Sequence, residues 1–352
     1  MQPAISMMKS LFRPDGNRFA GLFRSIAYSA LALGLFALVL LIAGKNPLLA
    51  YLDIFSSTFG SAYGFSEVLV RMIPLVLTAL AVALPARIWL INVGAEGQLY
   101  IGAVFATWGA LSFSGLPAFV LLPLMFILAF LGGGLWASIA GFLRAKGWVS
   151  ETISTLLLNY VAVLLSNFLI FGVWKDPQSA NYPQSPEFAA AARLPLFGHT
   201  RVHLGLIFAA VALLLFYLVL SRTRWGFEMR AIGGNQEAAR RAGIRIERYI
   251  FLLMLIGGGL AGLAGFGEVS AIQGRLRPSL SPGYGFIGFL VSWLSGGNPL
   301  GILVAAFLLA VISAGGDALQ IDHGLPGSIV NILMALILFV VLAQRGRKAG
   351  VK

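Results

Sequence analysis

The sequence predicts an all-α protein that lies in a membrane as a bundle of roughly ten transmembrane helices, with both termini cytoplasmic. Of its 352 residues, 59% are hydrophobic and only 11% are charged, whereas about 25% of the residues in a soluble domain are charged. Glycine is abundant, with 42 residues, as is typical of membrane helices that approach one another closely. Lipid rather than water is therefore the expected solvent for most of the chain.

Long apolar runs, close to the ~20 residues that cross a bilayer, define the predicted spans. They lie near residues 24–43, 68–90, 99–114, 118–143, 152–174, 203–221, 250–272, 284–297, 300–316 and 328–344. The runs at 99–114, 284–297 and 300–316 are short, and a broken or re-entrant helix is tolerated only where it faces protein or a polar cavity. The first run is longer than the core of a signal peptide, so we expect an uncleaved span.

The distribution of basic residues predicts the orientation of the bundle. With both termini inside, most of the 25 Lys and Arg residues fall on the cytoplasmic side, as the positive-inside rule requires. We expect a cytoplasmic tail over 1–23, a transmembrane domain over 24–345 and a cytoplasmic tail over 346–352. Two outer loops, 44–67 and 175–202, lack the size to fold alone and are predicted to cap the bundle.

Composition and motifs exclude several classes of function. The net charge of +12 would suit nucleic acid, but the basic residues lie at span ends and in loops, so no nucleic-acid partner is expected. With no Cys and three scattered His, no disulfide or metal site is expected. The chain has no phosphate-binding loop that ends in Gly-Lys-Ser/Thr and no nucleophile–base–acid set. We therefore expect a protein that is not an enzyme and holds no cofactor, with ATP bound by a separate chain if ATP drives it.

Residues 221–249 form the most basic segment, a loop predicted to lie in the cytoplasm. Its seven arginines are Arg222, Arg224, Arg230, Arg240, Arg241, Arg245 and Arg248. Gly233 and Gly234 interrupt the chain, and Asn235 is predicted to cap a short helix with Glu237 in its first turn. A narrow, smooth face follows from three alanines, Ala238, Ala239 and Ala242. Such a helix either docks in a groove of another protein or belongs to a solvated basic loop beside anionic lipid.

A polar turn at 92–98 interrupts two apolar runs. Buried polar groups are costly unless they are paired, so this turn either lines a route for a polar solute or simply caps the next helix. Its candidate path residues are Asn92, Glu96 and Gln98. A polar stripe that follows Trp148 adds Glu151, Asn159 and Asn167. On a membrane helix such a stripe either joins helices by hydrogen bonds or binds solute.

Small residues recur at every fourth position in two predicted spans. One series is Gly133, Ala137 and Gly141, and the other includes Gly258 and Gly262. Both are predicted to be faces where helices pack closely. Three acidic residues are predicted to be anchors at the outer ends of spans, rather than midplane groups for ion coupling: Glu268, Asp317 and Asp322.

Four segments, in this order, carry a resemblance to a known family. They are NVGAEGQLYIGA at 92–103, ETISTLLLNY at 151–160, GFEMRAIGGNQEAARRAGI at 226–244 and SGGNPLGILVAAFLLAVI at 295–312. Together they resemble the permease subunits of bacterial ABC importers for nucleosides and simple sugars, in the branched-chain amino acid and ribose permease superfamily. The GAEGQ form and the extended N-terminus are most similar to the longer of two paired permeases in nucleoside-type systems.

This resemblance implies a type II ABC importer fold and a non-catalytic transport subunit of the bacterial inner membrane. Two homologous permeases would form the channel as a heterodimer, each in contact with an ATPase, while a periplasmic or lipid-anchored binding protein delivers the solute. The coupling element corresponds to residues 226–244. Its docking candidates here are Gly233, Gly234, Asn235, Glu237 and Ala238. The implied solute is a nucleoside, with a simple sugar as the alternative.

An ion-coupled secondary transporter of a small polar solute is the alternative class. Such a transporter needs ionisable groups near the membrane midplane and often contains half-length helices. The short predicted spans agree with this class, whereas midplane charges are scarce. Uptake by the chain alone under an imposed ion gradient would favour it over an ABC importer.

Overall fold

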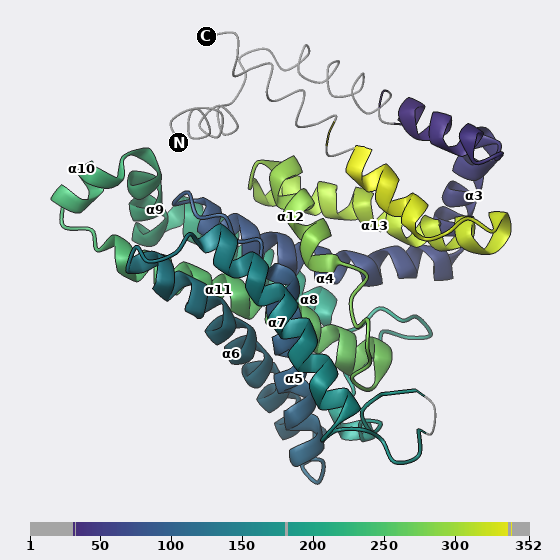
Figure 1. The fold of residues 1–352 in the computed structure, drawn as a ribbon, viewed down its shortest axis with the longest axis horizontal. Coiled ribbons are helices and arrows are strands. Elements are labelled where there is room, and N and C mark those ends of the chain that lie inside the picture. The colour runs from purple at the N-terminus through teal and green to yellow at the C-terminus, as the bar shows by residue number, and fades with distance from the viewer. Residues whose placement is uncertain (1–30, 32, 180–181, 337–338, 340–352) are drawn as a thin grey trace. The chain divides into compact units, whose positions relative to one another are not determined.

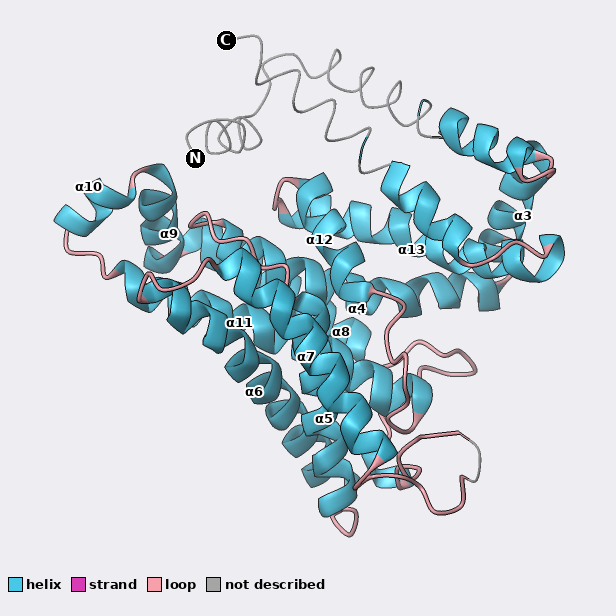
Figure 2. Cartoon of the chain, in the orientation of Figure 1, coloured by secondary structure: helices cyan, strands magenta, loops and turns pink. Residues whose placement is uncertain are grey.

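The structure is built from helices, with no strand among the residues it describes (Figures 1 and 2). The computed structural model describes residues 31, 33–179, 182–336 and 339, so the predicted tails at 1–23 and 346–352 lie outside it. The helices are Leu33–Ile42, α3 (Pro47–Phe59), α4 (Ala62–Ala86), α5 (Ala95–Ser112), α6 (Ala118–Ala145), α7 (Glu151–Phe171), α8 (Gly205–Arg222), α9 (Arg224–Gly234), α10 (Gln236–Arg241), α11 (Ile246–Gly267), α12 (Tyr284–Ser295), α13 (Pro299–His323) and residues 328–336, with the 3₁₀ turn η1 (Ala190–Ala192) and the π-helical segment η2 (Glu268–Gln273). The predicted all-α fold is confirmed.

Six described helices are long and apolar enough to cross a membrane, or seven if Leu33–Ile42 and α3, bent by 115°, form one span. The predicted count of about ten is not confirmed. As predicted for 284–297, α12 is short, with 12 residues. The expectation of a short span at 300–316 is wrong, because α13 has 25 residues. The helix continues because no proline interrupts it before Pro326 and its polar residues Asp317 and Asp322 are exposed at the surface.

The segment at 44–67 is helical, which corrects the prediction of a loop. Asn46 caps α3 by accepting a hydrogen bond from the Leu48 N–H at 2.9 Å, and Pro47 lies in the first turn. This combination favours a helix start. After Gly60 the chain enters α4 at Ala62. The local capping residues outweigh the modest length of the segment.

Contacts divide the chain into two units, one made of Met1–Val68 and Phe307–Lys352 and the other of Leu69–Ala306. The first unit has its own apolar core, formed by Phe36, Leu40, Ala50, Leu319, Leu325, Ile329 and Leu333. Within this unit a Cβ at Gly315 would overlap the Ile54 side chain, and one at Gly316 would overlap the Val330 side chain. Helix α13 therefore lies close against its neighbours in the first unit.

The centre of the second unit is the packing of α5, α6 and α11, which lie side by side in Figure 1. A Cβ at Gly133 would overlap the Gly258 carbonyl oxygen, and a Cβ at Gly262 would overlap the Ala129 carbonyl oxygen. A Cβ at Gly102 would overlap the backbone of Gly262. Backbones touch here because glycine has no side chain, so the close-packing faces predicted from the four-residue spacing are confirmed.

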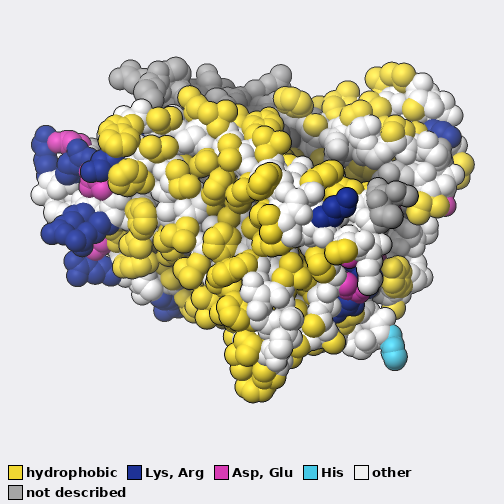
Figure 3. Space-filling model, turned by 60° about the horizontal axis from the view of Figure 1, so that its bottom comes forward, with side chains coloured by type: hydrophobic (Ala, Val, Ile, Leu, Met, Phe, Trp, Pro, Cys, Tyr) yellow, Lys and Arg dark blue, Asp and Glu magenta, His cyan; other side chains and the backbone are white. Residues whose placement is uncertain are grey.

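Charged side chains gather at the ends of the second unit, with an apolar surface between them. Figure 3 shows Lys and Arg side chains clustered at the left, over α9 and α10, beside a broad hydrophobic surface. By the positive-inside rule the end that carries α9 and α10 faces the cytoplasm. We call it the inner end, and the end that carries the loop before α8 the outer end.

Candidate functional site

The basic loop folds into two short helices at the inner end. Asn235 separates α9 from α10, and its side chain accepts hydrogen bonds from the N–H groups of Glu237 and Ala238 at 3.0 and 3.1 Å. Gly243 follows the end of α10 with a φ of +84°, a conformation that favours glycine. The predicted cap, the short helix and its glycine end are therefore confirmed.

Helix α10 exposes a face of small residues. Gly234, Ala238 and Ala242, four residues apart, are exposed, and a Cβ at Gly234 would meet nothing within 4 Å. Ala239 is buried, with 3% of its surface exposed. The prediction that it shares an exposed face with Ala238 and Ala242 is therefore wrong. Glu237 pairs with Arg241 at 3.2 Å beside this face. Three small, exposed residues therefore lie within and beside α10: Gly234 at the end of α9, Ala238 in α10 and Ala242 directly after it. We call them the α10 face.

Helix α9 is attached to the start of α11. Glu228 pairs with Arg224 at 2.8 Å and accepts a hydrogen bond from the Tyr249 hydroxyl. The hydrogen bond from Tyr249 and the charge of Arg224 hold the pKa of Glu228 below its usual range. The ring of Trp225 lies edge-on to that of Tyr249, with centroids 6.4 Å apart. These contacts fix the base of the basic loop to the membrane helix that follows it.

The segment between α4 and α5 joins the basic loop to the interior. Trp89 donates its indole N–H to the Gly233 carbonyl, and the Gln236 amide donates to the Ile88 carbonyl at 3.5 Å. Trp89 has a φ of +67°, which is unusual for a bulky residue. A Cβ at Gly233 would overlap the Arg87 carbonyl oxygen. We call residues 87–89 the strut, because they link α9 and α10 to the polar turn that begins at Asn92.

The polar turn is a closed set of hydrogen bonds. Asn92, fully buried, exchanges two hydrogen bonds with Gln98, at 2.8 and 3.0 Å, and donates to the Ala81 carbonyl at 3.1 Å. Its Oδ1 also accepts from the Gly94 N–H at 3.0 Å. The amide pair therefore fixes the entry to α5 and ties it to α4.

The polar stripe of α7 completes this set. Asn159 accepts from the Gly97 N–H at 2.8 Å and donates to the Val93 carbonyl at 2.9 Å. Glu151 accepts from the Ile91 N–H at 3.2 Å and pairs with Arg144 at 3.0 Å. Ser150 precedes α7 but makes no side-chain cap. The stripe thus joins α7 to the turn. Of its predicted residues only Asn167, eight positions after Asn159, has a buried Oδ1 without a partner among the described residues.

Helix α12 is bound at both ends by the chain between α4 and α5 and the start of α5. The Glu96 carboxylate, 5% exposed, accepts a hydrogen bond from the Gly285 N–H at 2.6 Å in the first turn of α12. At its other end, Arg87 donates to the Gly297 carbonyl. At the start of α12, beside Gly285, the Tyr284 carbonyl also accepts a hydrogen bond from Thr78 at 3.0 Å. A movement of residues 87–96 would therefore carry α12 with it.

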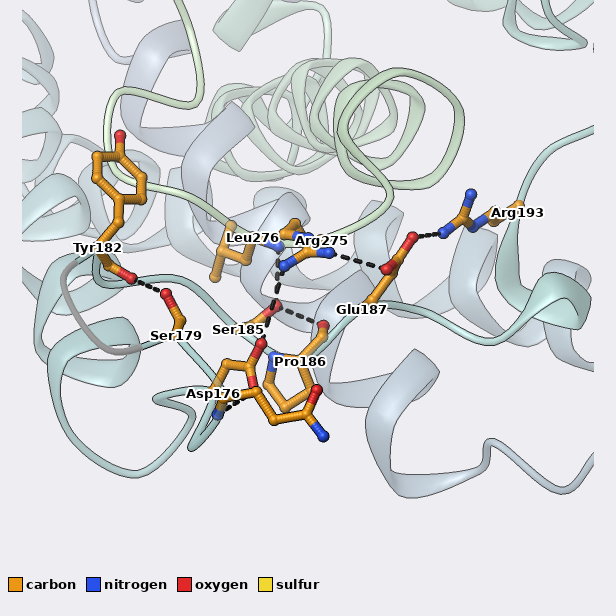
Figure 4. Close-up of polar contacts among 10 residues, drawn as sticks. Asp176, Ser179, Tyr182, Ser185, Pro186, Glu187, Arg193, Arg275 and Leu276 are labelled. Atoms are coloured by element: carbon orange, nitrogen blue, oxygen red, sulfur yellow. Dashed lines mark hydrogen bonds and ion pairs between the residues drawn. The ribbon is translucent and has the colours of Figure 1, made fainter.

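The outer end is closed by the loop before α8 (Figure 4). Arg275 pairs with Glu187 at 2.9 Å and with Asp176 at 3.8 Å, and Ser185 exchanges two hydrogen bonds of 2.9 Å with Leu276. The hydrogen bond and charge of Arg193, together with the smaller effect of the Arg275 charge, hold the pKa of Glu187 below its usual range. We call this cluster the outer clamp, since it ties the loop to the chain after η2.

Glu268 differs from its prediction as an interface anchor. It is 5% exposed and faces the charges of Arg71 and Arg201. Its burial continues that of the outer half of α11, where Ala261–Gly267 are all buried. The strut was not predicted, because Trp89 and Ile88 contact residues 144 and 148 positions further along the chain.

Comparison with known proteins assigns the chain to a family. A family model described as the permease component of branched-chain amino acid transport systems matches residues 64–342. The chain belongs to this permease family. As a permease, it is a multi-span membrane protein whose role is transport.

Three relatives of this permease cover most of both chains. The glucose ABC transporter permease TsgB13 of Haloferax volcanii is 41% identical over 90% of this chain and 85% of its own. The guanosine ABC transporter permease NupP of Bacillus subtilis is 35% identical over 90% of this chain and 92% of its own. The nucleoside ABC transporter permease NupB of Lactococcus lactis is 35% identical over 88% of this chain and 87% of its own.

Proposed function

We propose that this permease forms part of the path by which a nucleoside enters the cell, driven by a separate ATPase that docks on the α10 face. The observation that carries the proposal is that face itself: three small, exposed positions at the arginine-rich inner end, joined through Trp89 to the polar turn. A small-residue helix face suits insertion into a groove on a partner. ATP-driven movement of the partner would then reach the bundle as a rigid-body shift.

The substrate is inferred from the relatives. Two of the three, at 35% identity, are named for guanosine and for nucleosides, which supports a nucleoside. The relative at 41% identity is named for glucose, which supports a simple sugar as the second candidate. Both classes share a polyhydroxylated ring, which hydrogen-bonding side chains recognise. An extracytoplasmic binding protein delivers this solute to the permease.

Within the path candidates, the geometry separates two roles. Polar atoms of Asn92, Glu96, Gln98, Glu151 and Asn159 bind other parts of the chain and hold the turn in shape. Asn167 has a buried Oδ1 without such a partner in the described residues, which supports contact with solute. Large apolar side chains cover the exposed side of the same helix, including Leu157, Leu164 and Phe168. On this side a second, homologous permease completes the channel as a heterodimer.

The ion-coupled alternative has less support. Membership of an ABC permease family favours ATP over an ion gradient as the source of energy. Glu268 lies near the outer end of its span, whereas an ion-coupled transporter needs ionisable groups near the midplane. The transporter therefore uses a partner that hydrolyses ATP.

The test is Gly234→Trp in the assembled transporter, with Gly115→Trp as the control because a Cβ at either glycine would meet nothing within 4 Å. We expect Gly234→Trp to insert normally but to lose both co-purification with the ATPase and uptake of labelled guanosine, while the control keeps both. Unchanged uptake would remove the docking assignment. Uptake of glucose but not guanosine by the unmodified transporter would show that the substrate is a simple sugar, the second candidate.

A further inference from the structure

An apolar groove runs along α8. A cavity of about 590 Å³ separates this helix from α6, α9 and α11, and a second cavity of about 400 Å³ lies beyond it toward the outer end. Both are lined by Phe126 of α6 and Phe208 of α8. Packed protein interiors contain few voids larger than a water molecule. This space is open to the protein surface, so a second molecule can enter it, and we call it the α8 groove.

The lining of the groove selects the chemistry of its occupant. The larger cavity is lined by aliphatic and aromatic side chains throughout, such as Phe130, Leu215 and Leu260. A nucleoside or sugar would lose its hydrogen bonds to water there without replacement, so the groove lies outside the solute path. A flexible hydrocarbon chain fits such a surface, since it needs only apolar contact.

Positive charge meets the inner end of the groove. Leu215 and Val219 face the cavity along α8, and Arg222 follows Val219 by three residues, so it lies on the same side of the helix. Arg222 is exposed, and no hydrogen bond or ion pair involves it within the described residues. Trp225 lines the same end, as is typical of tryptophan at the level of lipid headgroups. Charge and lining together match an amphiphile with an anionic head and an apolar tail.

We propose that the α8 groove binds an anionic phospholipid of the inner leaflet, with an acyl chain between α8 and the α6–α11 pair and its phosphate against Arg222. A bound chain would fill the space under α8, whose contacts with α11 are few. The lipid would support the base of the basic loop, because Met229 of α9 also lines the cavity.

The test uses the assembled transporter after removal of lipid, with dioleoylphosphatidylglycerol and dioleoylphosphatidylcholine as probes. Native mass spectrometry counts bound lipid, and the midpoint of thermal unfolding reports its effect. We expect the wild type to favour the phosphatidylglycerol by about fivefold, the contribution of one arginine near the surface. Arg222→Gln should abolish this preference while phosphatidylcholine still binds. Equal binding of the two lipids by the wild type would overturn the proposal.

Filling the groove gives an independent arm. Ala212 lines the larger cavity, whereas Ala210 is exposed and does not line it. We expect Ala212→Trp to lose the bound lipid and Ala210→Trp to keep it. A photoreactive side chain at Leu215 should cross-link to phosphatidylglycerol. A cross-link to another protein chain at this position, or lipid retained by Ala212→Trp, would contradict the lipid site.

Discussion

Asn159 and Asn167 lie on the same membrane helix, α7, but differ in what they contact. Asn159 holds the polar turn through two hydrogen bonds, at 2.8 and 2.9 Å. Asn167 has a buried Oδ1 with no partner among the described residues. Asn159 thus has a structural role, whereas Asn167 is the residue that we propose contacts the solute.

Leucine at each position should separate these roles. Asn159→Leu leaves a buried N–H and a buried C=O unpaired, at a cost of about 1–3 kcal/mol each, so the midpoint of thermal unfolding should fall. Asn167→Leu should leave that midpoint unchanged and reduce uptake in proteoliposomes. Equal destabilisation by both variants, or wild-type uptake with Asn167→Leu, would remove Asn167 from the path.

His203 sits just before α8 and is 1% exposed. Its Nδ1 accepts a hydrogen bond from the Gly205 N–H at 3.1 Å, so the neutral ring holds the start of the helix. Burial lowers its pKa from 6.5 to about 4. Protonation would remove the acceptor and place a charge in a buried site.

The stability of the outer end should therefore depend on acid pH. Since the folded pKa of about 4 is below the unfolded value of 6.5, the unfolded chain binds more protons within this window. The stabilisation that neutral His203 contributes is fully present above pH 6.5 and is lost as pH falls toward 4. This loss amounts to about 3 kcal/mol in the free energy of unfolding. His203→Asn keeps an acceptor for Gly205 without titrating, so its unfolding midpoint should vary less with pH. An identical pH profile for both proteins would exclude His203 as the cause.

At the scale of elements, the contact between α6 and α11 depends on glycine residues, which have no side chain. A Cβ at Gly258 would overlap both the Ala137 Cβ and the Gly133 carbonyl oxygen. Since both neighbours belong to a helix backbone or lie directly on it, neither can move aside independently.

Gly258→Val should force α6 and α11 apart. Overpacking costs about 1–3 kcal/mol where side chains can adjust, so backbone overlap should cost at least this much and lower the yield of folded protein. Gly115→Val is the matched control, because a Cβ at Gly115 would meet nothing within 4 Å. Size-exclusion profiles and unfolding midpoints measure both, and a wild-type midpoint for Gly258→Val would refute the packing argument.

At the scale of the whole molecule, transport requires that movement at the inner end reach the polar turn. Within the Leu69–Ala306 unit, Trp89 connects the Gly233 carbonyl to the segment that leads into Asn92, and Arg87 connects the same segment to Gly297 after α12. The strut therefore lies between the proposed ATPase-docking face and two elements of the interior.

Trp89→Phe removes the indole N–H but keeps an aromatic ring at this position. We expect the ATPase to bind the variant as it binds the wild type, while solute imported per ATP hydrolysed falls severalfold. Trp148→Phe is the control, since Trp148 is 68% exposed in the turn between α6 and α7. Parallel measurement of uptake and ATP hydrolysis in proteoliposomes decides the matter, and a wild-type ratio for Trp89→Phe would show that the strut does not transmit movement.

The regular features of the protein could be predicted because their signals are local. The four-residue spacing of Gly133, Ala137 and Gly141 marks a helix face, and Asn235 before Glu237 marks a cap. The roles of Trp89 and Glu268 could not be predicted in this way. Trp89 contacts Gly233, far along the chain, and Glu268 is buried because the outer half of α11 packs against α5 and α6.

By itself the sequence determined that the protein is a helical membrane protein, where its basic loop begins a helix, and which glycine faces pack. Those properties follow from apolar runs, charge bias and residue size, which act over a few residues of chain. Tertiary structure alone decided that Ala239 turns inward, that Asn159 joins the polar turn while Asn167 does not, and that α8 leaves a groove. Each of these depends on which distant backbone atoms lie within hydrogen-bonding or contact distance, and a linear pattern of residue types contains no such distances.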